Sequence, residues 1–165
     1  MTGKGHVVFS VSCVYTYSLI SQIETTSFER MLVLMVAILS SLLPDIDHPK
    51  STFGSKLSFI SYPITLLFGH RGITHSLLMV TLLWYWCVYN IPWDALGQRT
   101  ASLCGLAFLI GYISHLIGDI LTPSGVPLLW PLRKRFSLNV LTNGFLTEVI
   151  VSILLPVVAI IILEL

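Results

Sequence analysis

Long apolar runs alternate with short polar segments along the whole chain. A helix that crosses the hydrocarbon of a bilayer needs about 20 apolar residues, and several runs come close to that length. The run Met31–Leu43 is shorter. Even when this run is extended to begin at Phe28, its helix must tilt little or thin the bilayer. The pattern predicts five membrane-spanning helices, at His6–Ile23, Met31–Leu43, Ile73–Trp93, Ala101–Leu121 and Phe145–Leu163.

The run Leu57–Gly69 differs from the predicted spans because it is too short to cross a bilayer and contains Pro63. We expect an interfacial or re-entrant segment here. The fold class that follows is an all-α integral membrane protein, with residues 1–165 forming a single polytopic domain.

The composition supports a membrane environment. Only 10% of the residues are charged and the mean hydropathy is +0.86, whereas soluble domains carry about 25% charged residues. The net charge of +1 and the absence of a basic run predict no nucleic-acid partner. The three cysteines lie in apolar runs without the spacing of a disulfide framework or a zinc motif. No pattern in the sequence predicts an oligomeric state.

The basic residues predict the orientation. When the predicted spans alternate in direction, most lysines and arginines fall on one side, which is cytoplasmic by the positive-inside rule. The N-terminus is then cytoplasmic and the C-terminus periplasmic. The cytoplasmic side receives Lys4, Lys50, Lys56, Arg71, Arg133, Lys134 and Arg135, and the other side receives Arg30 and Arg99.

The same side also collects the histidines and half of the acids. "GYISHLIGDIL" places His115 and Asp119 on one helix face, because residues four apart lie together. The pair can ligate a metal ion, or it can form a hydrogen bond that only holds helices together. The polar residues on this side are His6, Asp45, Asp47, His48, His70, His75, His115, Asp119 and Glu148.

Two loops bring further candidate ligands. In "GHRGITHSLL", a turn at Gly72 can direct His70 and His75 toward one centre, with Thr74 as the cap of the next span. Arg71 suits a phosphate or carboxylate ligand, unless it is simply a basic residue at the membrane surface.

In "LLPDIDHP", the prolines favour an extended path that points Asp45 and Asp47 the same way, next to His48. Two adjacent carboxylates repel unless a cation neutralises them, so they indicate one or two divalent ions, or else a solvated acidic loop. Glu148 can be a ligand, a general base or a helix cap, and His6 is a ligand or incidental. Zinc is the metal that this donor set favours.

The motifs "LLPDIDHP", "HRGITHSLL", "GYISHLIGDILTPSGVPLLWP" and "NGFLTE" together resemble those of the LexA-regulated, inner-membrane-associated metal-dependent hydrolases, the YdjM-like family. The resemblance runs from "GHVVFS" to Glu148. It implies a bacterial inner-membrane hydrolase whose expression belongs to the SOS response. The motif residues carried over are Asp45, Asp47, His48, His70, Arg71, His75, His115 and Asp119, with His6 and Glu148.

The sequence thus predicts a metal-dependent hydrolase with a cytoplasm-facing site, acting on a phosphate ester or diester of a membrane lipid or lipid-linked substrate. Arg71 would bind the phosphate, and Asp47 or Glu148 would act as base. The alternative is a non-catalytic membrane protein, with an ion-handling, structural or regulatory role, that uses the same polar cluster.

Overall fold

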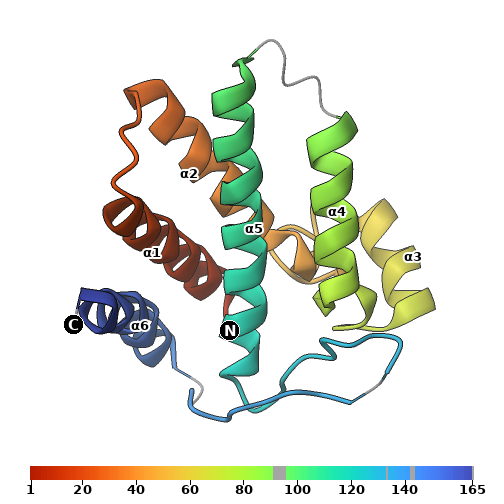
Figure 1. Ribbon diagram of the computed structural model, residues 1–165. Coiled ribbons are helices and arrows are strands. Elements are labelled where there is room, and N and C mark those ends of the chain that lie inside the picture. The colour runs from red at the N-terminus through yellow and green to blue at the C-terminus, as the bar shows by residue number, and fades with distance from the viewer. Residues whose placement is uncertain (91–95, 133, 142–143, 165) are drawn as a thin grey trace.

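The computed structural model describes residues 1–90, 96–132, 134–141 and 144–164. The described residues form α-helices joined by turns and one long loop, which confirms the predicted all-α class (Figure 1). Their bounds are α1 Gly3–Ser21, α2 Ser27–Leu42, α3 Ser58–Phe68, α4 Leu77–Asn90, α5 Gln98–Ile120 and α6 Phe145–Glu164, with two 3₁₀ turns, η1 Pro44–Asp47 and η2 Ile73–His75.

Helix α5 lies at the centre of the molecule, with α1 and α2 on one side and α4 on the other (Figure 1). Small residues allow α5 to approach α2 closely. A Cβ atom at Gly111 would lie 2.0 Å from Ser40 Oγ and 2.4 Å from the Ala37 carbonyl oxygen. Glycine therefore permits backbone contact at this crossing, as small residues commonly do between membrane helices.

The opposite end of α2 is fixed by a capping box. The Thr26 hydroxyl accepts a hydrogen bond from the Glu29 amide, and the Glu29 carboxylate accepts one from the Thr26 amide. The Glu29 carboxylate also lies 3.6 Å from Arg99 Nε and within reach of Thr100, both at the start of α5. These contacts join the N-terminal ends of α2 and α5.

Two local predictions are wrong. Residues 44–47 form the 3₁₀ turn η1 instead of an extended strand, because Pro44 occupies its first position, where a missing N–H costs nothing. Thr74 does not cap α4. The Ser76 hydroxyl instead accepts a hydrogen bond from the Met79 amide, while the Thr74 hydroxyl donates to Asp47.

Two of the described segments are long and apolar enough to cross a membrane, Ser27–Asp47 and Gln98–Ile120. They match the second and fourth predicted spans. Helix α4 begins later than the predicted span Ile73–Trp93 because η2 occupies its start, and residues 91–93 of that span lie outside the described residues. Helix α3 has 11 residues, which fits the prediction of a segment too short to cross.

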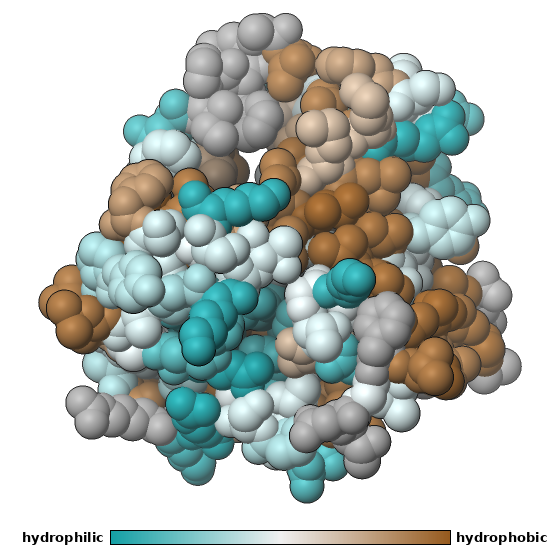
Figure 2. All heavy atoms as spheres, turned by 180° about the vertical axis from the view of Figure 1, so that it is seen from behind, coloured by the Kyte–Doolittle hydropathy of each residue, from teal (hydrophilic) through white to brown (hydrophobic). Residues whose placement is uncertain are grey.

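The molecule buries polar groups and exposes apolar ones. His75, His115 and Asp119 are fully buried, whereas Leu66 and Leu67 of α3 are 87% and 73% exposed. Viewed from behind, hydrophobic side chains form broad patches on the surface, and hydrophilic ones lie both near its upper edge and in its lower half, toward which the N-terminus and the end of α5 lie (Figure 2). This distribution is the one expected for helices surrounded by lipid.

Candidate metal centre

Helix ends from distant parts of the chain meet at one buried cluster. His6 lies in the first turns of α1, Asp45 in the turn after α2, His75 just before α4, and His115 and Asp119 in the last turns of α5. Apart from Asp45, whose side chain is 17% exposed, each of these side chains is at most 1% exposed. Water is therefore largely excluded from the cluster.

The Nε2 atoms of His75 and His115 lie close to each other and to one carboxylate oxygen each of Asp45 and Asp119. His75 Nε2 is 3.3 Å from His115 Nε2, 3.5 Å from Asp119 Oδ2 and 3.8 Å from Asp45 Oδ1. His115 Nε2 is 3.7 Å from the same Asp119 oxygen and 3.8 Å from the same Asp45 oxygen. Tetrahedral ligands placed about 2.0–2.2 Å from a zinc ion are about 3.3–3.6 Å apart. The cluster nearly has the dimensions of such a site.

Hydrogen bonds fix the orientation of both imidazole rings. His115 Nδ1 lies 2.6 Å from the Ser41 carbonyl oxygen, which can only accept, so Nδ1 carries the proton. His75 Nδ1 lies 3.0 Å from the Thr74 hydroxyl, whose own proton goes to Asp47, so Nδ1 also donates. The two Nε2 atoms, left without protons when the rings are neutral, then face each other with lone pairs. Such an arrangement needs a shared proton or a cation.

Buried atoms without hydrogen bonds lie at the same place. In the described part of the chain, neither Asp119 Oδ2 nor either ring nitrogen of His6 has a hydrogen-bond partner. The His6 ring stacks on His115 at a centroid separation of 3.6 Å, and its Nε2 lies 3.3 Å from Asp119 Oδ1. Unpaired buried polar atoms are costly, and a bound ion would satisfy them. The residues therefore fit a divalent metal.

Five of the eight predicted ligands belong to two overlapping groups that share His115. In each group the ligand atoms lie within 4.8 Å of one another. The overlap suits either one ion with alternative ligands or two neighbouring ions. The groups are His6, Asp45 and His115, and His75, His115 and Asp119.

Asp47, His48 and His70 lie outside these two groups. Asp47 is behind His75, and its carboxylate accepts hydrogen bonds from the Arg71 amide and the Thr74 hydroxyl. It also lies 3.1 Å from His70 Nδ1. Its oxygens are thus engaged, and they orient the surrounding groups in the way that carboxylates behind metal-bound histidines do.

His48, His70 and Arg71 surround an opening to the cluster. The His48 and His70 rings stack at 4.5 Å, and the His70 side chain is 43% exposed. Together with Asp45 and Lys50, these three residues line a cavity of about 370 Å³. The Arg71 guanidinium donates to Asp119 Oδ1 at 3.0 Å and to Ser124, while its Nε makes no hydrogen bond within the described residues.

Glu148 is placed at the start of α1 rather than in the ligand groups. Its carboxylate accepts hydrogen bonds from the Thr2 amide at 3.0 Å and the Thr2 hydroxyl at 2.7 Å. Thr2 in turn caps α1 through the Gly5 amide. The contact thereby joins α6 to α1.

Sequence reasoning missed four groups that support the cluster. They are the Met1 ammonium, 2.7 Å from Asp119 Oδ1, the Ser41 carbonyl, the Ser124 hydroxyl and the Thr74 hydroxyl, which donates to Asp47. A main-chain carbonyl leaves no signal in a sequence. Thr74 was conspicuous between two candidate ligands, but its position before a helix favoured a cap.

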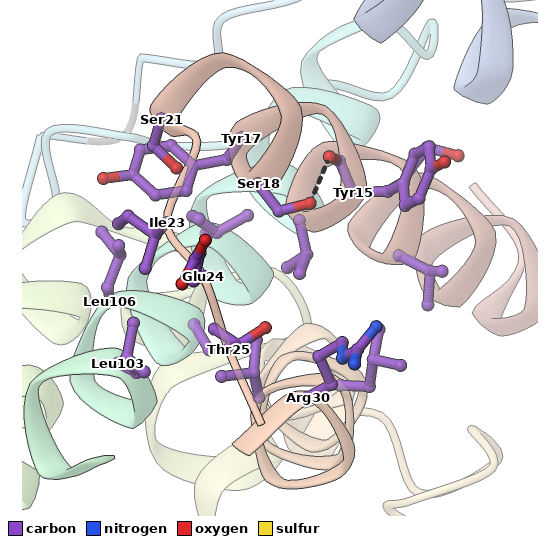
Figure 3. A pocket seen from close by; sticks show the side chains of 17 residues that line it. Tyr15, Tyr17, Ser18, Ser21, Ile23, Glu24, Thr25, Arg30, Leu103 and Leu106 are labelled. Carbon is purple, nitrogen blue, oxygen red and sulfur yellow. Dashed lines mark hydrogen bonds between the residues drawn. The ribbon is translucent and has the colours of Figure 1, made fainter. Parts of the chain in front are cut away.

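A larger cavity, of about 870 Å³, lies between α1, α2 and α5 away from this cluster (Figure 3). Leu103 and Leu106 of α5 face Tyr17 and Ile23 across it, with Arg30 near one end (Figure 3). None of the predicted site residues lines it, and its walls are largely apolar. The predicted site residues therefore lie away from this cavity.

The buried imidazoles and carboxylates and the exposed apolar side chains define an α-helical membrane protein with a candidate metal centre. Comparison with known families identifies which one: the model of the YdjM inner membrane protein family matches residues 1–164, and the chain belongs to this family.

Several curated proteins are similar to the chain. The Inner membrane protein YdjM of Escherichia coli (strain K12) is 45% identical over 142 residues, covering 86% of this chain and 71% of that protein. The Uncharacterized protein YvsG of Bacillus subtilis (strain 168) is 32% identical over 158 residues, covering 92% of this chain and 88% of that protein. No solved structure matches.

Proposed function

We propose that the protein is a zinc-dependent hydrolase of the bacterial inner membrane, with its site at the cytoplasmic leaflet. The observation that carries this proposal is the pair of His75 and His115 Nε2 atoms, which face each other at 3.3 Å beside Asp45 and Asp119. Residues 1–165 form one polytopic domain.

Five membrane crossings account for the arrangement. If α1, α2, α4, α5 and α6 alternate in direction, the start of α1, the end of α2, the start of α4, the end of α5 and the start of α6 all lie on one side. These are the ends that meet around the cluster, while α3 lies at the interface. The excess of basic residues assigns that side to the cytoplasm, with the N-terminus inside and the C-terminus in the periplasm.

Asp45, His75, His115 and Asp119 would hold the ion, and His6 would replace one of them or serve a second ion. Zinc bound there supplies a Lewis acid that polarises a phosphoryl oxygen and makes water a nucleophile at neutral pH. Asp47 accepts a hydrogen bond from the Thr74 hydroxyl, which in turn holds His75 Nδ1, so Asp47 is a positioning residue rather than a ligand.

Two cations make a phosphate the best substrate group. Arg71 and Lys50 line the 370 Å³ cavity in front of the cluster, and their positive charges suit a phosphate oxygen. A site at headgroup depth favours a phosphate ester or diester of a lipid or lipid-linked molecule.

His70 is the best candidate for proton transfer. Its Nδ1 is held by Asp47, which leaves Nε2 for the cavity, as in other histidine bases oriented by a carboxylate. In the reaction, water oxygen bonds to phosphorus and the bond to the leaving oxygen breaks. His70 receives the proton of the water and returns it to the leaving oxygen. This role replaces the one expected for Asp47 or Glu148.

Metal analysis and turnover test the proposal together. Detergent-purified protein reconstituted with zinc should retain about one or two equivalents, and it should hydrolyse a chromogenic phosphodiester. His70→Gln should retain zinc and lose turnover. Zinc binding with no turnover of any phosphate ester would instead support the non-catalytic alternative, in which the ion holds the helix ends together. Regulation by LexA stays a prediction, because it concerns the gene's operator rather than the chain.

The orientation has its own test. Cysteine introduced at Lys50 should react with a membrane-impermeant thiol reagent only from the cytoplasmic side, and cysteine at Arg99 only from the periplasmic side. Labelling of both positions from one side would contradict the five-crossing arrangement.

A further inference from the structure

Another cavity adjoins the polar 370 Å³ cavity, on the other side of His70 and Arg71. It has a volume of about 600 Å³ and lies between the end of α3 and the loop that follows α5. In Figure 1 this loop runs beneath α4 toward α3. Its walls include Leu67, Phe68, Pro127, Trp130, Pro131 and Arg135.

The two cavities differ in chemistry. The 370 Å³ cavity is lined mostly by polar residues such as Asp45, His48 and Lys50, whereas the 600 Å³ cavity combines aromatic and aliphatic side chains with basic ones. The rings of Phe68 and Trp130 meet edge to face at 6.0 Å. Among the described residues, only His70 and Arg71 line both cavities, so this pair forms the boundary between a polar space and one of mixed polar and apolar character.

This cavity lies beside exposed leucines. Leu67 is 73% exposed on α3, and the facing loop exposes Leu129 by 50% and Leu132 by 62%. Arg135 lies at the rim and donates to the Ser124 carbonyl oxygen. A basic residue next to exposed leucines is typical of a segment that lies at the interface of a bilayer.

We propose that this cavity receives the hydrocarbon chain of an amphiphilic phosphate whose phosphate group lies against Arg71. The inference rests on the proposed function and specifies its substrate: a lipid phosphate that reaches the site from the bilayer, between α3 and the loop. The phosphate would occupy the polar cavity, and the chain would lie against Leu67, Phe68 and Trp130. Free phosphate, by contrast, would use only the polar side.

Trp130 provides a direct readout. The other three tryptophans, Trp84, Trp86 and Trp93, are replaced by phenylalanine, and the zinc-loaded protein is placed in nanodiscs of a neutral phospholipid. Dodecyl phosphate brominated in its chain is added, because bromine quenches tryptophan fluorescence on contact. We expect saturable quenching that plain dodecyl phosphate reverses, and that neither dodecyl maltoside nor inorganic phosphate reverses.

Two neighbouring leucines supply a matched pair of variants. Leu67 lines the cavity and Leu66, which is 87% exposed, does not. Leu67→Asn should raise the probe concentration needed for half-maximal quenching about tenfold, the effect of losing about half of a buried leucine's apolar contact. Leu66→Asn should change it less than about twofold. Partition of the probe into the bilayer is the same for both, so it cancels in the comparison.

The outcomes separate this inference from the proposed function. Protein that binds zinc and hydrolyses a short-chain phosphodiester, but shows no reversible quenching, would overturn the hydrocarbon site alone. Equal effects of the two leucine variants would also overturn it. Reversible quenching in protein that binds no zinc would support the lipid site and refute the hydrolase.

Discussion

Replacing His115 by alanine should abolish stabilisation of the protein by zinc. The ring contributes Nε2 to both ligand groups, and its Nδ1 donates to the Ser41 carbonyl at the end of α2. The substitution therefore removes a ligand from the proposed site and also breaks a link between α5 and α2.

The two effects can be estimated separately. Zinc at 100 times its dissociation constant adds about 2.7 kcal/mol to the free energy of unfolding. For a chain of this length that corresponds to a rise in Tm of about 5–11 °C. Without zinc, the variant loses one buried hydrogen bond and its stacking on His6, which together should lower stability by about 1–3 kcal/mol.

Thermal unfolding in mild detergent, with chelator and with zinc, measures both effects. Ser114→Ala is the matched control, because Ser114 is buried on the same helix but donates only to the Gly111 carbonyl. The control should keep the full zinc-dependent rise in Tm. A rise of equal size in the His115 variant, at the same zinc concentration, would refute the assignment of His115 as a ligand.

Three further predictions concern the second layer of the site and the helix crossing. Asp47→Asn should weaken zinc binding about 10–100-fold, as loss of an orienting carboxylate does. Asp45→Asn removes a ligand and should weaken zinc binding more. Competition with a zinc chelator measures both affinities, and the reverse order would contradict the assignment. Thr74→Val removes the hydroxyl that donates to Asp47 and should cost about tenfold in the same assay, while unchanged affinity would argue against its role. Gly111→Ala should lower stability by about 1–3 kcal/mol because its Cβ would overlap α2 at 2.0 Å. Gly105→Ala meets no atom closer than 3.7 Å and should be neutral or stabilising, so equal Tm values for the two would refute the packing argument.

The all-α class could be predicted because apolar runs and their polar boundaries are local features of the sequence. The placement of His115 and Asp119 on one face also followed from helix geometry, and the structure brings them within 3.7 Å of each other. The convergence of His75 and Asp45 on that pair followed from one assumption, that the helices alternate in direction.

The roles of individual carboxylates could not be predicted in the same way. Asp45 and Asp47 flank Ile46 in one short motif, and an extended path would have pointed both the same way. The 3₁₀ turn separates them, so that Asp45 lies near the imidazole Nε2 atoms while Asp47 contacts His70 and the Arg71 amide. These partners are more than 20 residues away along the chain, and no local pattern specifies them.

The central claim is that one divalent cation is bound where the helix ends meet. X-ray absorption spectroscopy of the zinc-loaded protein in detergent tests it most directly. The proposed site predicts a first shell of nitrogen and oxygen ligands at about 2.0–2.2 Å, including two imidazoles, and no sulfur. Retention of less than about 0.2 equivalents of zinc, or a shell without imidazole scattering, would contradict the account.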